Sequence, residues 1–281
     1  MKKYFVISDI HGCFSLMHQA LIKHGFDENN KEHILISLGD IFDRGNQNYE
    51  MYEYLKNFPK DRKILIRGNH EYLLQKLLRD KEPKAHDFSN GTVNTVMEIS
   101  DALSDKKYWK DRCDVLKLIS DWIDSDEWVN YYELDRFIFV HSFIPVRLMG
   151  DAKKKYAEYP PYRVEMECVY NGFTNYLTQL NDFRECKAKA RWETATWGCP
   201  YVLFEGGLFD KEVKKGKVLV CGHWSASDFH EHYEGIEDNN NIFNGANMIA
   251  LDGKTPFSHH VNVLVLEEKK DGKIEIVPET F

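Results

Sequence analysis

Three short apolar runs in the first quarter of the chain each lead directly into a group of charged and polar residues. The runs YFVIS (4–8), HILISL (33–38) and KILIR (63–67) are rich in β-branched or aromatic residues and too short for helices, so they predict buried strands. In an open α/β sheet, ligands bind beyond the carboxyl ends of the strands. Any fold built on these runs must therefore bring the polar residues that follow them to one edge of a sheet.

The rest of the chain predicts an α/β (α+β) fold in a single domain, residues 1–281. A helix is expected after the first strand, with Ser15 as its N-cap and Gly25 as its stop. Leucines at helical spacing after the third strand predict a mainly helical insertion over residues 72–130. Five more strands make the second half β-rich, at 136–142, 217–223, 247–253, 260–268 and 273–279. No linker is long enough to divide the chain.

Charge and composition narrow the class of protein. The net charge of −8 lacks the basic face that a nucleic-acid backbone requires, so no nucleic-acid partner is expected. No segment reaches the roughly 20 apolar residues of a membrane span, and the N-terminal apolar run is too short for a signal peptide. The six cysteines form no C-x-x-C pair, which is typical of reduced thiols. These features together predict a cytoplasmic protein, and they do not indicate its oligomeric state.

The residues at five predicted strand ends are of types that bind metal ions. They are Asp9, His11, Asp40, Asp43, Arg44, Arg67, Asn69, His70, Glu71, His141 and His223. Carboxylate, amide and imidazole groups together suit Mn, Fe or Zn better than an all-oxygen Ca²⁺ site. A pair of divalent ions needs a bridging carboxylate and about three further protein ligands each, with open positions for substrate. The set therefore predicts two divalent metal ions, with Mn²⁺ expected first and Fe or Zn as alternatives.

Each candidate also has a simpler interpretation. Asp9, Asp40 or Asn69 alone could cap the helix that follows its strand. His141 and His223 alone could be hydrogen-bonded histidines at strand ends. Capping, however, predicts no particular partner at the other strand ends, so the combination favours the dinuclear site.

Three motifs carry a resemblance to a known family. D-x-H-G at 9–12, G-D-x-x-D-R-G at 39–45 and G-N-H-E at 68–71, followed by two isolated histidines, resemble the metallophosphoesterase motifs of PPP-type serine/threonine protein phosphatases. The likeness is strongest to bacterial and phage members and to the related symmetrical diadenosine tetraphosphatases. The resemblance implies a calcineurin-like fold, a two-sheet β-sandwich flanked by helices with the metals at one edge.

The resemblance also implies a role for each matching residue. The metal ligands would be Asp9 and His11 on the first ion, Asp40 as the bridge, and Asn69, His141 and His223 on the second. His70 would be the general acid, oriented by Asp43, and Arg44 and Arg67 would hold phosphate oxygens. Arg191 is the candidate for a further phosphate-binding arginine, with a plain surface arginine as the alternative. The chain departs from the family at Ser8, where glycine is common, and at Phe143, which would reshape the substrate groove.

The expected activity is metal-dependent hydrolysis of phosphomonoesters by in-line attack of a metal-bridging hydroxide, as in a serine/threonine protein phosphatase. The alternative is a symmetrical diadenosine tetraphosphate hydrolase, in which Tyr159, Tyr162 or Phe143 would stack on an adenine. Both reactions cleave a P–O bond at the same metals, so the motifs leave open a phosphoprotein, a small phosphoester or a nucleotide as substrate. A phosphate-binding protein without turnover is a third interpretation, and a nuclease is disfavoured by the acidic charge.

Overall fold

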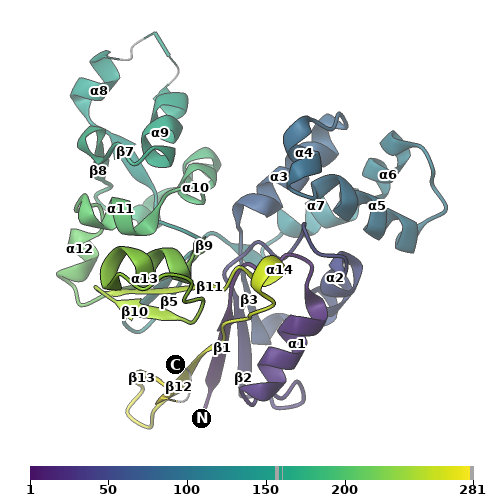
Figure 1. The fold of residues 1–281 in the computed structure, drawn as a ribbon, viewed down its shortest axis with the longest axis horizontal. Coiled ribbons are helices and arrows are strands. Elements are labelled where there is room, and N and C mark those ends of the chain that lie inside the picture. The colour runs from purple at the N-terminus through teal and green to yellow at the C-terminus, as the bar shows by residue number, and fades with distance from the viewer. Residues whose placement is uncertain (156–157, 160, 279–281) are drawn as a thin grey trace.

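Two β-sheets form the centre of the molecule (Figure 1). The structure, a computed structural model, describes residues 1–155, 158–159 and 161–278, with only the backbone at residues 161 and 162. In this part of the chain the six-stranded sheet has the order β13-β12-β1-β2-β3-β4 and the five-stranded sheet the order β10-β11-β9-β6-β5. A separate two-stranded ribbon pairs β7 with β8.

Each of the eight predicted runs contains a strand, although the run 260–268 is a strand only from Leu264, and five further short strands in the described residues were not predicted. The six-stranded sheet contains β1 (Lys3–Ile7), β2 (His33–Ser37), β3 (Lys63–Ile66), β4 (Trp128–Val129), β12 (Leu264–Glu268) and β13 (Ile274–Ile276). The five-stranded sheet contains β5 (Tyr132–Leu134), β6 (Phe137–Phe139), β9 (Val218–Ser225), β10 (Phe243–Gly245) and β11 (Met248–Asp252). The ribbon consists of β7 (Val146–Leu148) and β8 (Leu177–Gln179). The last predicted strand ends at residue 279, which lies outside the described residues.

Parallel pairing brings the carboxyl ends of the important strands together. β2 pairs in parallel with both β1 and β3, and β9 pairs in parallel with both β6 and β11. Apolar side chains of the two sheets interdigitate between them, for example Val6 and Ile36 from one sheet with Phe139 and Val220 from the other. Burying one face of each sheet in this way supplies the driving force for the sandwich.

Helices flank the two sheets, and part of them extends beyond the sheets as two projecting groups (Figure 1). On the six-stranded side lie α1 (Phe14–Lys23), α2 (Asn48–Asn57), α3 (Asn69–Asp80), α4 (Ala85–Ser89), α5 (Thr92–Leu103), α6 (Trp109–Val115) and α7 (Lys117–Ile123). On the other side lie α8 (Gly150–Lys155), α9 (Pro161–Tyr170), α10 (Lys189–Ala195), α11 (Pro200–Glu205), α12 (Asp210–Val213) and α13 (Ala226–Glu234). The short α14 (Thr255–Ser258) follows β11. Each group of helices has its own apolar core against a sheet.

The predicted fold class is confirmed, and two local predictions are wrong. The second half is not simply β-rich, because most of the segment from α8 to α12 is helical and its mixed pattern hid this. Ser15 is not the N-cap of α1, which is Cys13. The Ser15 N–H instead donates to Oε1 of Gln47, a side chain from a distant loop (3.0 Å). Within the described residues, no helix combines the length and apolar character needed to cross a bilayer.

A buried ion pair anchors the start of β3, the strand that leads into Asn69 and His70. The Lys63 ammonium is almost fully buried, lies 2.8 Å from Oε2 of Glu127 and donates to the Leu55 carbonyl (2.6 Å). Burial would raise the pKa of Glu127, but the hydrogen bond and charge of Lys63 outweigh it and lower the pKa from 4.5 to about 2. The carboxylate therefore stabilises the fold above pH 4.5, and this contribution is lost as the pH falls through about 2.

We expect Glu127→Gln to lower the free energy of unfolding by about 3 kcal/mol at pH 7, since it leaves the buried ammonium without its anion. The deficit should shrink as the pH is lowered from about 5 toward 2, because the wild-type carboxyl then becomes protonated as well. Urea unfolding at a series of pH values measures both effects. Glu275→Gln, at an exposed carboxylate, is the control and should change little. A deficit that does not depend on pH would contradict the assignment.

Candidate metal centre

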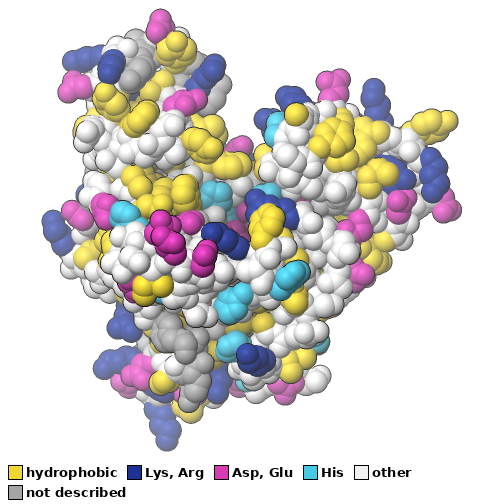
Figure 2. Space-filling view, in the orientation of Figure 1, with side chains coloured by type: hydrophobic (Ala, Val, Ile, Leu, Met, Phe, Trp, Pro, Cys, Tyr) yellow, Lys and Arg dark blue, Asp and Glu magenta, His cyan; other side chains and the backbone are white. Residues whose placement is uncertain are grey.

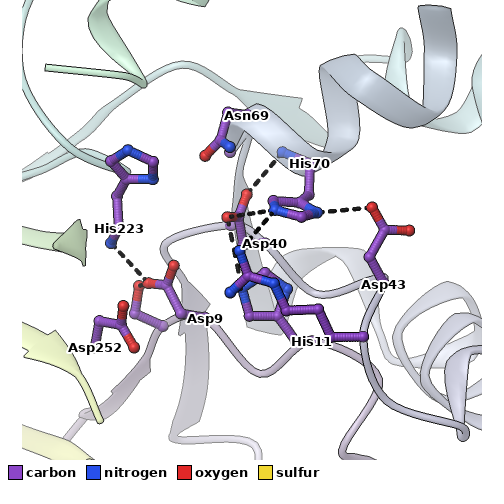
Figure 3. A network of polar contacts seen from close by, with 12 residues as sticks. Asp9, His11, Asp40, Asp43, Asn69, His70, His223 and Asp252 are labelled. Carbon is purple, nitrogen blue, oxygen red and sulfur yellow. Dashed lines mark hydrogen bonds and ion pairs between the residues drawn. The ribbon is translucent and has the colours of Figure 1, made fainter. Parts of the chain in front are cut away.

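The six predicted metal ligands converge at one edge of the sandwich, and Figure 3 labels all of them except His141, which lies against Asp40 and Asn69. Asp9 and His11 follow β1, Asp40 follows β2, and Asn69 begins α3 directly after β3. The five-stranded sheet supplies His141 after β6 and His223 from within β9. All except His223 are at most 2% exposed, and His223 is half-buried. Both sheets therefore contribute to a single polar cluster.

The loops at this edge hold their side chains inward through an unusual backbone. Asp9, Asp40, Asp43 and His223 have φ values of 53°, 53°, 75° and 64°, in the left-handed region that non-glycine residues rarely adopt. Such conformations cost of the order of 1–3 kcal/mol each and cluster at functional sites. Close approach also matters, because a Cβ at Gly68 would collide with Oδ1 of Asp40. The loops are therefore strained at the residues whose side chains they direct into the polar cluster.

Asp40 lies at the middle of the cluster. Its Oδ2 is 3.8 Å from Nε2 of His11 and 3.9 Å from Nε2 of His70, and its Oδ1 is 3.5 Å from Nε2 of His141. Two overlapping groups have ligand atoms within 4.8 Å of one another, His11–Asp40–His70 and Asp40–His141–His223. Asp40 is the member that both groups share, as a bridging carboxylate would be.

The hydrogen bonds of two imidazoles test whether the cluster fits cations. Nδ1 of His11 lies 2.9 Å from the Phe42 carbonyl, and Nδ1 of His141 lies 2.9 Å from the Leu38 carbonyl. A carbonyl only accepts, so each Nδ1 carries a proton, and each Nε2 is the ring atom turned toward Asp40. Nε2 of His141 also lies 2.8 Å from Oδ1 of Asn69, another acceptor. Imidazole nitrogens held through Nδ1, a carboxylate and an amide oxygen that meet in a buried site form a set of ligand atoms that suits a divalent metal.

The charges at the centre support the same conclusion. Burial and the nearby Asp40 raise the pKa of Asp9. Burial and the nearby Asp9 raise the pKa of Asp252, at the end of β11, well above its usual value. Burial lowers the pKa of His11 and lowers that of His223 to about 3, so these rings are neutral at neutral pH. Carboxyl groups whose pKa values are raised by burial and by each other are groups whose ionised forms a bound cation would favour.

Asp252 was not among the predicted site residues. Figure 3 shows its side chain beside that of Asp9. Its carboxylate accepts the backbone N–H of Lys254 (2.7 Å). It also lies close enough to the carboxylates of Asp9 and Asp40 for their charges to raise its pKa. The rule used for the other strands would have found it, since Asp252 ends a predicted strand that pairs with β9.

His70 and Asp43 form a close pair. Nδ1 of His70 lies 2.7 Å from Oδ2 of Asp43, which is fully buried. Burial alone would lower the pKa of His70, but Asp40 and Asp43 outweigh it and raise the pKa above its usual value. Arg44 lies against the same ring, with Nη2 3.3 Å from Nε2 of His70 and Nη1 3.0 Å from Nε2 of His11. The ring of His70 and the guanidinium of Arg44 therefore face the centre from one side.

Glu71 holds two of the ligand loops together, a role that the sequence did not reveal. Its carboxylate accepts backbone N–H groups from Asp40 (2.9 Å), Ile41 (3.0 Å) and Gly68 (2.7 Å). The first two belong to the loop after β2 and the third to the loop after β3. Glu71 thus ties the position of Asp40 to the start of α3.

Two predicted phosphate ligands are engaged elsewhere. All three nitrogens of the Arg67 guanidinium donate to the segment 123–130, to the Ile123 carbonyl (2.9 Å), Oδ1 of Asn130 (3.3 Å) and the Ser125 carbonyl (3.3 Å). Arg191 on α10 pairs with the buried Glu165 of α9, with Nε 3.2 Å from Oε1. Phosphate binding by either residue stays a prediction, and these contacts are structural.

The aromatic residues proposed to stack on an adenine differ in where the structure places them. Phe143 is wrong for this role, because it is 2% exposed and packs in the outer core near Phe209 (ring centroids 6.1 Å apart). Tyr159 is half exposed beside α9 and lines a cavity there. The side chain of Tyr162 lies outside the described residues. The departure from the family pattern at Phe143 therefore does not reshape the groove.

A cavity of about 300 Å³ opens directly beside Asn69. One wall is α3, with Tyr72 and Lys76, and the other is formed by α9, α10 and Trp197. Its lining residues are Asn69, Tyr72, Leu73, Lys76, Met166, Glu167, Tyr170, Glu193 and Trp197. In Figure 2 the molecule is hollowed between the helices on the two sides, with hydrophobic side chains on the wall that includes α9. Tyr170 is 63% exposed in this cavity, so a planar group could lie against its ring.

Comparisons with known proteins place these features in context. The sequence profile of the family described as "Calcineurin-like phosphoesterase" matches residues 2–249. A symmetrical bis(5′-nucleosyl)-tetraphosphatase of Buchnera aphidicola (from Schizaphis graminum) is 30% identical over 252 residues, covering 80% of this chain and 84% of that protein. The serine/threonine-protein phosphatase 1 of Salmonella typhimurium is 35% identical over 72 residues, covering 26% of this chain and 31% of that protein.

A solved structure shares the overall fold. A variant of a cold-active protein tyrosine phosphatase aligns with 98% of this chain and 80% of its own, with a TM-score of 0.52 and 15% identity. At this level of identity the likeness concerns the fold alone.

Proposed function

This chain belongs to the calcineurin-like phosphoesterase family of metal-dependent hydrolases, and on that premise we propose that it cleaves dinucleoside polyphosphates at two divalent metal ions. The observation that carries the chemistry is the Asp40 carboxylate between two groups of imidazoles whose Nε2 atoms face it. Asp9, His11, Asp40, Asn69, His141 and His223 would hold the metals. When bound, the metals would supply a deprotonated water and neutralise phosphate charge.

The remaining steps belong to side chains of this chain. Arg44 can hold phosphate oxygens through its planar fork, since its Nη atoms already point into the centre. His70 would donate the proton on Nε2 to the leaving oxygen, and Asp43 would hold the ring through Nδ1. The chemistry needs no covalent bond between the protein and the phosphorus.

Two observations support a nucleotide as the substrate. The tetraphosphatase relative matches along most of the chain, whereas the protein phosphatase relative matches over a segment about as long as the three shared motifs. The cavity beside Asn69 offers the exposed ring of Tyr170 and the indole of Trp197, and a nucleobase can stack on such side chains. A phosphoprotein is the second candidate, because the phosphatase relative is 35% identical over 72 residues.

The test compares diadenosine tetraphosphate with a phosphoserine peptide, each with Mn²⁺ and with a chelator. We expect metal-dependent release of ADP from the dinucleotide at a much higher kcat/KM than release of phosphate from the peptide. Tyr170→Ala should raise KM for the dinucleotide by about 10-fold, a loss of roughly 1–3 kcal/mol of stacking. It should leave p-nitrophenyl phosphate hydrolysis unchanged, since that substrate has no base. Preferential turnover of the peptide would move the assignment to a protein phosphatase.

A further inference from the structure

One face of α5 is directed at the loop that carries Asp43. Thr92, Thr95 and Glu98 are spaced three residues apart, so they lie on the same side of this helix. α5 also packs against α2 and α3, the helices that follow the second and third ligand loops. Its first turn is in close contact with the loop, because a Cβ on Gly91 would lie 2.5 Å from the backbone nitrogen of Arg44. The helical segment after β3 thus reaches back to the centre.

Both oxygens of the Asp43 carboxylate are occupied by threonine hydroxyls. Thr92 Oγ1 donates to Oδ2 (2.7 Å) and Thr95 Oγ1 donates to Oδ1 (2.7 Å). His70 Nδ1 shares Oδ2 at the same distance, and all three contacts are buried. Charge-assisted bonds of this length are among the stronger ones in proteins. With a donor on each oxygen, the carboxylate has one orientation, and in it Oδ2 points at the His70 ring.

The backbone of Asp43 is tied to the same helix. Its N–H donates to Oδ1 of Asn48 (2.8 Å), and Nδ2 of Asn48 donates to Oε2 of Glu98 (2.7 Å). The other oxygen of Glu98 accepts the N–H of Tyr49 at the start of α2 (3.0 Å). Side chain and main chain of Asp43 are therefore both fixed from α5.

The simpler explanation is that the two threonine hydroxyls only donate hydrogen bonds to backbone carbonyls of their own helix. Thr95 Oγ1 does lie 3.3 Å from the Gly91 carbonyl, but the contact with Asp43 is shorter by 0.6 Å and is to a charged group. Thr92 is the first residue of α5, so no carbonyl of the preceding helical turn is available to it. Packing alone does not require a hydroxyl at either position, because valine has the same shape.

We propose that Thr92 and Thr95 are positioning residues that hold Asp43, and through it His70, for proton donation to the leaving group. The proposal rests on the acid role of His70 in the proposed function and gives the helical segment a part in the reaction. It requires only the P–O chemistry of the family and does not depend on which substrate is physiological.

The test is the leaving-group dependence of the Thr92→Val/Thr95→Val variant. An alkyl phosphate needs a proton on its departing oxygen, whereas nitrophenolate leaves without one. We expect kcat for the alkyl ester to fall about 10- to 100-fold, a part of the 10²–10⁴ that a general acid supplies. For p-nitrophenyl phosphate kcat should change less than about 3-fold, with KM and metal content unchanged. The single variants should show intermediate losses, and Thr92→Ser/Thr95→Ser should restore alkyl-ester turnover because it keeps both hydroxyls.

Val96→Ala is the matched control, since it removes buried methyl groups from the same helix without touching Asp43. It should lower the melting temperature and keep the wild-type leaving-group dependence. In an Asp43→Asn background the two valines should add no further loss on the alkyl ester. Equal losses on both esters would overturn the proposal, and so would full activity of the double valine variant.

A second readout does not need turnover. The Nδ1–H proton of His70, hydrogen-bonded to Asp43, should give a low-field NMR resonance that shifts in Thr92→Val/Thr95→Val and stays in place in Val96→Ala. An unshifted resonance would overturn the proposal. Failure of the proposed function would be seen separately, as lack of ADP release from diadenosine tetraphosphate by the wild-type protein.

Discussion

Asp40→Asn is expected to remove metal and activity together. The variant keeps the size of the side chain and can still accept the backbone N–H of His70 (2.9 Å). It removes the negative charge of the carboxylate that belongs to both metal-binding groups. Metals in such sites supply several kcal/mol of transition-state stabilisation, so kcat should fall on the order of 10³-fold. Elemental analysis of the purified protein should show well below one ion per chain, and excess Mn²⁺ should restore little activity.

A matched control comes from Asp87, another buried aspartate. Its Oδ2 accepts the Lys84 N–H at the start of α4 (2.7 Å), and Asp87 is not a member of the two metal-binding groups. Asp87→Asn should reduce stability slightly and leave metal content unchanged. If Asp40→Asn retained two ions per chain, Asp40 could not be the bridging ligand.

His70→Asn is the second variant with a large expected effect. Loss of a general acid should lower kcat by about 10²–10⁴ on substrates with poor leaving groups. The ring also lies with His11 and Asp40 in a group that could itself hold a metal, so the geometry allows two roles. The raised pKa of His70 favours the acid, since a metal ligand must be neutral, whereas a hydrogen bond from Nδ1 to a carboxylate fits either role.

Metal content separates the two roles of His70. Unchanged metal content with reduced kcat would support the acid, whereas loss of one ion would make His70 a ligand. His33→Asn is the control, because His33 is also buried but accepts the Asp27 N–H (3.0 Å) instead of facing the centre. That variant should keep wild-type kinetics.

Much of the candidate site could be predicted because its residues follow strands. The apolar runs before Asp9, Asp40 and Asn69 indicate neighbouring parallel strands, whose carboxyl ends must share an edge. This rule places ligands that are far apart in the chain without any knowledge of side-chain contacts. Glycines within the motifs, such as Gly68, add that the backbone comes close to the ligands there.

Other features depend on tertiary packing that no local pattern reveals. Thr92 and Thr95 look like ordinary helix residues, and only the docking of α5 on the loop after β2 turns them toward Asp43. Phe143 follows His141 in the sequence, yet its side chain turns into the outer core. The helices between α8 and α12 are short and interrupted by prolines and glycines, so their periodicity is weak.

The sharing of the centre by two sheets has a consequence for how the chain matures. Asp9 and His223, joined by a hydrogen bond from the His223 N–H to Oδ2 of Asp9 (2.9 Å), are separated by 214 positions. A nascent chain that has exposed only the three motifs holds an incomplete set of ligands. A cation that binds ligands from both sheets would link the two sheets. Because it binds only the assembled site, it would stabilise the native state by mass action. Metal uptake would then be a late event that reports whether the whole sandwich has been assembled.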